Sequence, residues 1–123
     1  MKQTMNTFED GRGIQINTSN GYTVSIGLGS GHYCENYNAG YGEHGEHTST
    51  MEVAIMRHTS HPDYNPERNM GADFVCLPMD VASYVPVSVL GDLVLAVECN
   101  DWARACFLCG ESEEDESKFP KKA

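Results

Sequence analysis

The sequence contains no apolar run near the roughly 18 residues that a membrane-spanning helix needs, so we expect no membrane association. Its first ten residues, MKQTMNTFED, have no apolar segment after the lysine, and we expect no secretory signal. Five cysteines without such a signal indicate free thiols in a reducing compartment rather than a disulfide framework. Together these absences predict a cytoplasmic protein.

Basic residues are also scarce: 8 Lys and Arg stand against 18 Asp and Glu, which gives a net charge of −10. The bases of residues 1–110 are widely scattered: Lys2, Arg12, Arg57, Arg68 and Arg104. A nucleic-acid surface needs several clustered Lys and Arg side chains that contact phosphates. The composition therefore argues against direct nucleic-acid binding. It fits a basic protein partner, or simply a negative surface that keeps the chain in solution.

The length of 123 residues fits one domain with a single core. Residues 13–28 predict a β-hairpin, because two alternating segments flank the turn signal Ser-Asn-Gly at 19–21. The alternation places Tyr22, Val24, Ile26 and Leu28 inward, with Thr23, Ser25 and Gly27 outward. Residues 48–57 predict a third strand with Met51, Val53 and Ile55 inward, and the apolar residues 72–78 a fourth.

A helix is expected from Pro86 to residue 101, because proline suits the first helical position. Its apolar residues recur at helical spacing: Val87, Leu90, Leu93, Val94 and Val97. Residues 101–109 are expected to add a helical turn, in which Trp102 and Phe107 cover the core edge. Cys76 and Cys99 are expected in the core, because free cysteines behave as small apolar residues.

We therefore predict an α+β fold: an antiparallel sheet of about four strands, with one or two C-terminal helices packed on one face. Residues 1–110 form the single domain. Residues 111–123 form an acidic tail of low apolar content, which predicts disorder.

Four of the five histidines form two pairs, each separated by two residues: His44 with His47, and His58 with His61. Structural zinc requires four converging Cys or His ligands, and the single Cys-x2-Cys pair, Cys106 and Cys109, lies some 45 residues further on. The predicted strand 48–57 also separates the pairs by roughly 30 Å. We therefore expect solvated loop histidines and no cofactor, with a zinc-stabilised module as one alternative.

Two other chemical motifs are weak. Cys34 lies two residues after His32 on a glycine-rich loop, but no orienting carboxylate is evident in the sequence. The glycine-rich segment 27–31 leads into more loop rather than into a helix, whereas a phosphate site needs a helix N-terminus. We therefore expect no enzyme.

The segments NGYTVSIGLGSGHYCEN, MEVAIM, DVASYV and LGDLVLAVE, in this order, resemble small acidic proteins encoded by tailed phages and prophages. The resemblance covers roughly residues 13–98 apart from the loops, and the segment HPDYNPERNMG and the tail depart from it. Those proteins have no assigned activity, so no residue role carries over. What the resemblance implies is a phage accessory protein in a bacterial host cytoplasm.

Two long polar segments, 29–45 and 58–71, carry most of the tyrosines and lack apolar periodicity. We predict a non-enzymatic counter-defence or host-takeover protein that binds a bacterial host protein through these loops. The alternative is a sponge for a nucleotide-like signal, with a homo-oligomer as a possible form. The predicted binding residues are Tyr33, Asn36, Tyr37, Tyr41, Arg57, Tyr64 and Arg68.

Overall fold

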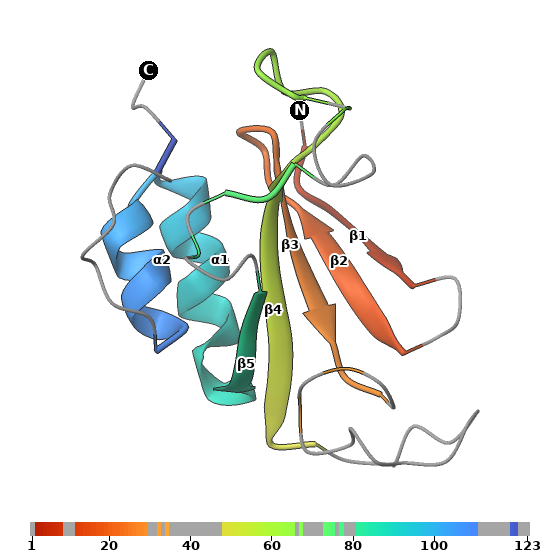
Figure 1. Cartoon of the computed structure of the whole chain (residues 1–123). Coiled ribbons are helices and arrows are strands. Elements are labelled where there is room, and N and C mark those ends of the chain that lie inside the picture. The colour runs from red at the N-terminus through yellow and green to blue at the C-terminus, as the bar shows by residue number, and fades with distance from the viewer. Residues whose placement is uncertain are drawn as a thin grey trace.

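The computed structural model describes residues 2–8, 12–29, 32, 34, 48–65, 67, 73–75, 77, 81–110 and 119–120. It confirms the α+β class: a five-stranded antiparallel sheet precedes two helices that pack on one side of it (Figure 1). The elements are β1 (Thr4–Thr7), β2 (Gly13–Asn17), β3 (Tyr22–Gly27), β4 (Thr50–Arg57), β5 (Val81–Pro86), the 3-10 helix η2 (Val87–Val89), α1 (Leu90–Glu98) and α2 (Trp102–Leu108).

The sheet is a meander in which every strand pairs with its neighbours in the sequence, in the order β1-β2-β3-β4-β5. The predicted hairpin is confirmed by the pairing of β2 with β3, in which Ile16 lies opposite Val24. Ile26 lies opposite Val53 in the β3–β4 pair, so alternate residues of the two strands project onto one face. Because the inward alternation continues across three strands, the sheet has one apolar face, which the helices cover.

The core lies between that face and the helix layer. Its sheet side includes the predicted Tyr22, Val24, Ile26, Met51, Val53 and Ile55, and its helix side Leu93, Ala96, Val97, Trp102, Ala105, Cys106 and Cys109. Two predicted core positions are wrong: Cys99 is exposed, and Phe107 has 63% of its surface exposed. Cys99 follows the last residue of α1, where the apolar stripe has already ended.

The sequence prediction missed β1, a strand of four exposed residues. Its sequence TMNT has no apolar alternation, so hydrophobic pattern alone could not reveal it. Another correction concerns the opposite face of the sheet, where Thr23 was expected to point to solvent but is only 5% exposed. Its hydroxyl donates a hydrogen bond to Asn17 Oδ1 at 2.9 Å, so this buried polar group is satisfied.

The predicted fourth strand, residues 72–78, does not form a strand in its described residues, 73–75 and 77. Phe74 forms only an isolated bridge with Met56, although the Val75 N–H also donates to the Ile55 carbonyl at 2.8 Å. The real fifth strand is β5, which pairs with the Thr50–Ala54 part of β4. Because β5 pairs with Thr50–Ala54, only the last residues of β4, Ile55–Arg57, remain available to residues 73–75.

The helical region starts later than predicted. Pro86 has an extended backbone (φ −60°, ψ 132°) and is the last residue of β5, and the α-helix proper begins at Leu90 after the 3-10 turn. The φ angle of proline suits a strand edge as well as a helix start, so the residue did not distinguish them. At the other end, Phe119 packs against the core and Pro120 is buried, so these two residues of the acidic tail contact the domain.

Candidate binding surface at one end of the sheet

Four of the predicted site and metal-candidate residues lie in the described part of the chain: Arg57, His58, His61 and Tyr64. All four belong to the end of β4 and the loop that follows it, which we call the 58–65 loop. The remaining predicted residues lie outside the described residues: Tyr33, Asn36, Tyr37, Tyr41, His44, His47 and Arg68. The structure therefore places four of these eleven residues together, Arg57 at the end of β4 and the other three in the 58–65 loop.

This loop is shaped by its two histidines. The Ser60 N–H donates to His58 Nδ1 at 3.1 Å, and the Asp63 N–H donates to His61 Nδ1 at 3.0 Å. Each ring nitrogen accepts from the amide two residues later, as Asn and Asp side chains do in Asx-turns. Backbone bonds from His61 to His58 and from Tyr64 to His61 complete two successive turns. His58 and His61, two of the four histidines that suggested a metal site, thus act as turn-forming residues.

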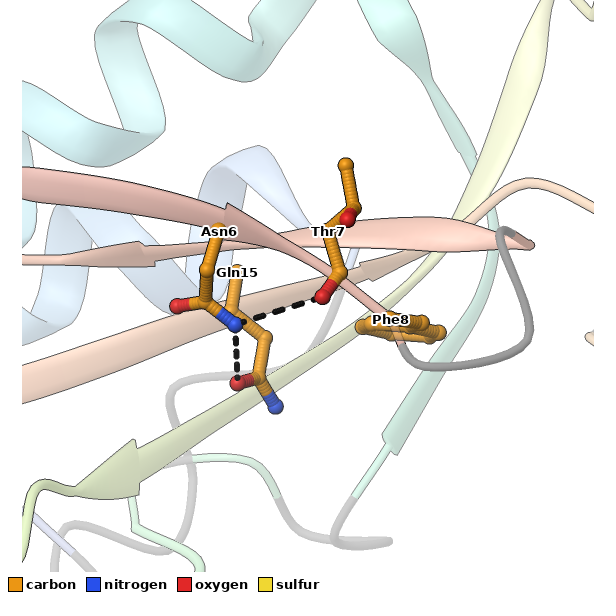
Figure 2. Close-up of a pocket in the computed structure, with 4 residues that line it drawn as sticks. All are labelled: Asn6, Thr7, Phe8 and Gln15. Carbon is orange, nitrogen blue, oxygen red and sulfur yellow. Dashed lines mark hydrogen bonds between the residues drawn. The ribbon is translucent and has the colours of Figure 1, made fainter.

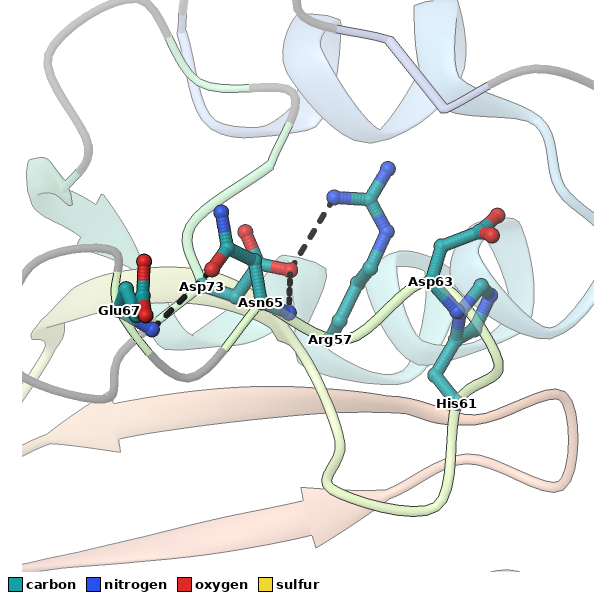
Figure 3. Close-up of polar contacts among 6 residues, drawn as sticks. All are labelled: Arg57, His61, Asp63, Asn65, Glu67 and Asp73. Carbon is teal, nitrogen blue, oxygen red and sulfur yellow. Dashed lines mark hydrogen bonds and ion pairs between the residues drawn. The ribbon is translucent and has the colours of Figure 1, made fainter.

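Asp73 fixes the far end of the same loop. Its buried carboxylate (1% exposed) lies 3.3 Å from Arg57 Nη1 and accepts the Asn65 N–H at 3.0 Å. Its carbonyl also accepts the Arg57 N–H at 2.9 Å, and Figure 3 shows the carboxylate between Asn65 and Arg57. Asn65 in turn accepts the Glu67 N–H at 3.1 Å. One buried carboxylate therefore joins the end of β4 to the loop.

The pairing changes the role of Arg57. Arg57 is among the binding residues that the sequence predicts. The structure places its guanidinium against Asp73, with only 19% of the Arg57 side chain exposed. Arg57 is thus part of the scaffold that holds the loop, and its charge is already compensated.

The loop packs beside the β2–β3 turn, and the two line a cleft of about 260 Å³. Gly21 takes a positive φ of 92° at this turn and lets the His61 side chain approach its backbone. The His58 N–H donates to the Gly21 carbonyl at 2.9 Å. Asn20 also lines the cleft, and its Nδ2 donates to the Val97 carbonyl of α1 at 2.8 Å. The turn therefore connects the loop to the helix layer.

Below the cleft, aromatic rings connect the loop to the core. The His61 ring lies 4.9 Å from the Tyr22 ring, and Trp102 meets Tyr22 edge-on at 4.7 Å, measured between ring centroids. Burial raises the pKa of the Tyr22 phenol above its ordinary value of 10.0; Arg57 opposes this shift, and Asp63 and Asp73 add to it.

This shift predicts alkaline sensitivity. A pKa that is higher in the folded than in the unfolded state means that unfolded Tyr22 loses its proton first as the pH rises above about 10. The contribution of protonated Tyr22 to the free energy of unfolding is complete below that pH and is lost as the pH rises through the folded-state pKa. We expect the free energy of unfolding of Tyr22→Phe to fall less steeply with pH, between about pH 9 and 11, than that of the parent chain. Urea unfolding at each pH measures this, and identical slopes would contradict it.

A second polar cluster lies on the sheet face opposite the helices. His32 Nδ1 is 3.3 Å from Glu52 Oε1, and the His32 ring lies 5.4 Å from that of Phe8. Gly27 permits this arrangement, because a Cβ there would collide with the His32 ring. Glu52 is thus a carboxylate partner of His32 that is not evident from the sequence. It lies opposite Gly27 in the β3–β4 pair, so only the strand register brings it to His32.

Cys34 does not complete a catalytic pair with that histidine in the described contacts. Its thiol is buried, and its Sγ lies 3.8 Å from the Gly29 carbonyl oxygen. A nucleophilic cysteine needs access and a base within hydrogen-bonding reach. The observed partner is a backbone carbonyl, which activates no thiol.

Side-chain amides form a network on the same polar face. Asn17 Nδ2 donates to Thr4 Oγ1 at 3.0 Å and to Asn6 Oδ1 at 3.3 Å, and Asn6 Nδ2 donates to Gln15 Oε1 at 3.3 Å. Asn6, Gln15, Thr7 and Phe8 line an open pocket of about 450 Å³ (Figure 2). This network joins β1 to β2 through side chains as well as through the backbone.

Comparisons with protein-family models, with curated proteins and with solved structures find no significant match. Among the described residues, no group of three or more His, Cys, Asp or Glu side chains is arranged to hold a metal ion. No helix in this part of the chain has the length and apolar character to cross a membrane.

Proposed function

We propose that this chain is a non-enzymatic phage accessory protein that inhibits a bacterial host protein by binding it through the 58–65 loop. The phage setting is supported by the resemblance of residues 13–98 to small acidic phage proteins. The observation that carries the binding role is the fixation of the loop by the buried Asp73 carboxylate, which holds both Arg57 and Asn65.

A loop fixed in this way is suited to recognition. Binding costs less conformational entropy when the contacting segment is already ordered, and loops on a rigid scaffold often carry recognition sites. The exposed residues of the loop are polar or small: Thr59, Ser60, Pro62, Asp63 and Asn65. Of these, Ser60 and Pro62 line the cleft. The net charge of −10 favours a partner with a basic surface.

Charge reversal at Asp63 tests the proposal. The Asp63 side chain is exposed, and only its backbone N–H takes part in the turn, so Asp63→Arg leaves the loop intact. Asp92→Arg makes the same change on the exposed side of α1 and serves as the matched control. With immobilised protein and bacterial lysate, we expect a stoichiometric protein partner that the parent and Asp92→Arg retain and Asp63→Arg loses.

Three outcomes are informative. Selective loss of the partner with Asp63→Arg supports the loop as the binding surface. Equal retention by both variants places the surface elsewhere and contradicts the role of the loop. The absence of any stoichiometric partner across lysates of several bacterial hosts contradicts the binding function itself.

A further inference from the structure

The outer edge of β1 pairs with no other strand in the described part of the chain. β1 stands at the end of the strand order, and Figure 1 shows it at the edge of the sheet with no described strand beyond it. The Phe8 N–H donates to the Gly13 carbonyl of β2. Because backbone groups alternate sides along an antiparallel strand, Thr4 and Asn6 also face β2, whereas Met5 and Thr7 direct their N–H and C=O groups outward. The Thr7 carbonyl also accepts the Asn6 side-chain amide at 3.4 Å, and a carbonyl oxygen can accept a second hydrogen bond.

The two edges of the sheet differ in how well they are protected against the addition of another strand. The β5 edge contains a register shift opposite Met51 and Val53, a positive φ of 53° at Tyr84, and Pro86 at its end. Bulges and prolines of this kind prevent further strand addition. β1 has none of these features within Thr4–Thr7, and none of its four residues is charged although the chain carries a net charge of −10.

The two faces of β1 also have distinct chemistry. Met5 belongs to the apolar face and is 66% exposed, the highest exposed fraction among the large apolar side chains of the described residues. Thr4 and Asn6 belong to the polar face and extend the amide network from Asn17 to the sheet edge. An added strand would therefore need an apolar residue between two polar ones. β1 itself has this pattern.

We propose that two copies of this chain pair through β1 in an antiparallel, two-fold symmetric arrangement, with Met5 opposite Met5 of the second copy. The pairing would join two five-stranded sheets into one continuous sheet. This surface is separate from the 58–65 loop, so the proposal does not depend on the proposed function.

This register satisfies both faces at once. Met5 meets its symmetry mate on the apolar side, and Thr4 lies opposite Asn6 of the second copy on the polar side. Residues 3, 5 and 7 supply the outward backbone groups, so the pairing forms about six backbone hydrogen bonds. No acidic side chain lies within β1 to oppose the approach of two negatively charged copies.

The same register also provides an occupant for the open pocket beside Phe8. Positions 2 and 8 lie opposite each other across the two-fold axis, so Lys2 of one copy lies beside the Phe8 ring of the other. Asn6 and Gln15 amides line that pocket with Phe8, as Figure 2 shows. An ammonium group near an aromatic face and amide oxygens is in a favourable environment. Lys2 is exposed in the single chain and free to reach it.

The oligomeric state tests the surface. A strand-edge interface of this length belongs to the small, weak class, so we expect a monomer–dimer equilibrium in the micromolar to millimolar range by sedimentation velocity, without an N-terminal tag. Met5→Lys sets two like charges opposite each other and should leave only monomer. Leu95→Lys is the matched control, because Leu95 is 61% exposed on α1, and it should dimerise like the parent.

Cysteine cross-linking tests the register, in a background with the exposed Cys99 changed to serine. Mixing Thr4→Cys with Asn6→Cys should give a disulfide-linked heterodimer under mild oxidation, because these residues are directly opposed, whereas each variant alone should not cross-link. Efficient cross-linking of Asn6→Cys alone would overturn the Met5-centred register. A parent chain that stays monomeric at millimolar concentration, or dimers unaffected by Met5→Lys, would overturn the surface.

Discussion

Asp73→Ala is expected to lower the free energy of unfolding by about 3 kcal/mol, because it removes one partner of a buried ion pair. The carboxylate is 1% exposed and holds Arg57 and the Asn65 N–H. Without it, Arg57 keeps a charge with no counter-charge at that position, and a backbone donor loses its acceptor. The value is at the lower end of the usual range because 19% of the Arg57 side chain remains exposed.

Two variants separate the ion pair from general effects. Asp73→Asn retains an oxygen that can accept one of the two hydrogen bonds, so we expect a smaller loss than for alanine. Asp63→Ala removes a nearby carboxylate that is exposed, and we expect its effect to be within about 0.5 kcal/mol. Urea unfolding followed by circular dichroism measures all three. Equal midpoints for Asp73→Ala and Asp63→Ala would show that the buried pair contributes nothing.

Hydrogen exchange adds a readout specific to the loop. The Asn65 N–H bonds to Asp73 and should exchange faster in Asp73→Ala than in the parent, under conditions in which the β3–β4 amides remain protected. If Asn65 and the sheet amides lose protection equally, the carboxylate stabilises the whole fold rather than the loop.

The sequence pattern predicted the elements that have a regular buried face. β3 and β4 place alternate residues in the core, Ile14 of β2 packs against it, and the helix stripe correctly places Leu93 and Val97 in it. β5 escaped prediction because its buried residues, Ala82 and Val85, are three apart rather than two. The register shift between Met51 and Val53 is what allows both to face the core. A local irregularity of this kind depends on the neighbouring strand.

The candidate site shows a similar limit. The sequence drew attention to His58, His61 and Tyr64 because polar residues without periodicity indicate a surface loop. It did not identify Asp73, which lies within an apolar segment and becomes important only because residues 73–75 complete the edge of β4. Partners that are 16 residues apart, such as Arg57 and Asp73, become visible only when the strand register is known.

Trp102→Ala is expected to have an equal or larger effect, a loss of about 3–5 kcal/mol, because it removes a large side chain from a packed core. Trp102 is 3% exposed at the start of α2, and its ring meets Tyr22 at 4.7 Å between centroids. The helix start at this point is also capped, since Asp101 accepts the Arg104 N–H at 3.2 Å. The substitution therefore removes the contact between a capped helix and the aromatic residue below the cleft.

Trp102→Phe is the matched variant. It keeps an aromatic ring next to Tyr22, and the indole Nε1 that it removes is buried with no hydrogen-bond partner among the described residues. Phenylalanine therefore loses volume without losing a described hydrogen bond, so we expect well under half the effect of alanine. Urea unfolding must be followed by circular dichroism, since Trp102 is the single tryptophan and both variants lack its fluorescence. If phenylalanine destabilises as much as alanine, the indole nitrogen has a partner that the described contacts do not contain, and the aromatic contact with Tyr22 contributes little.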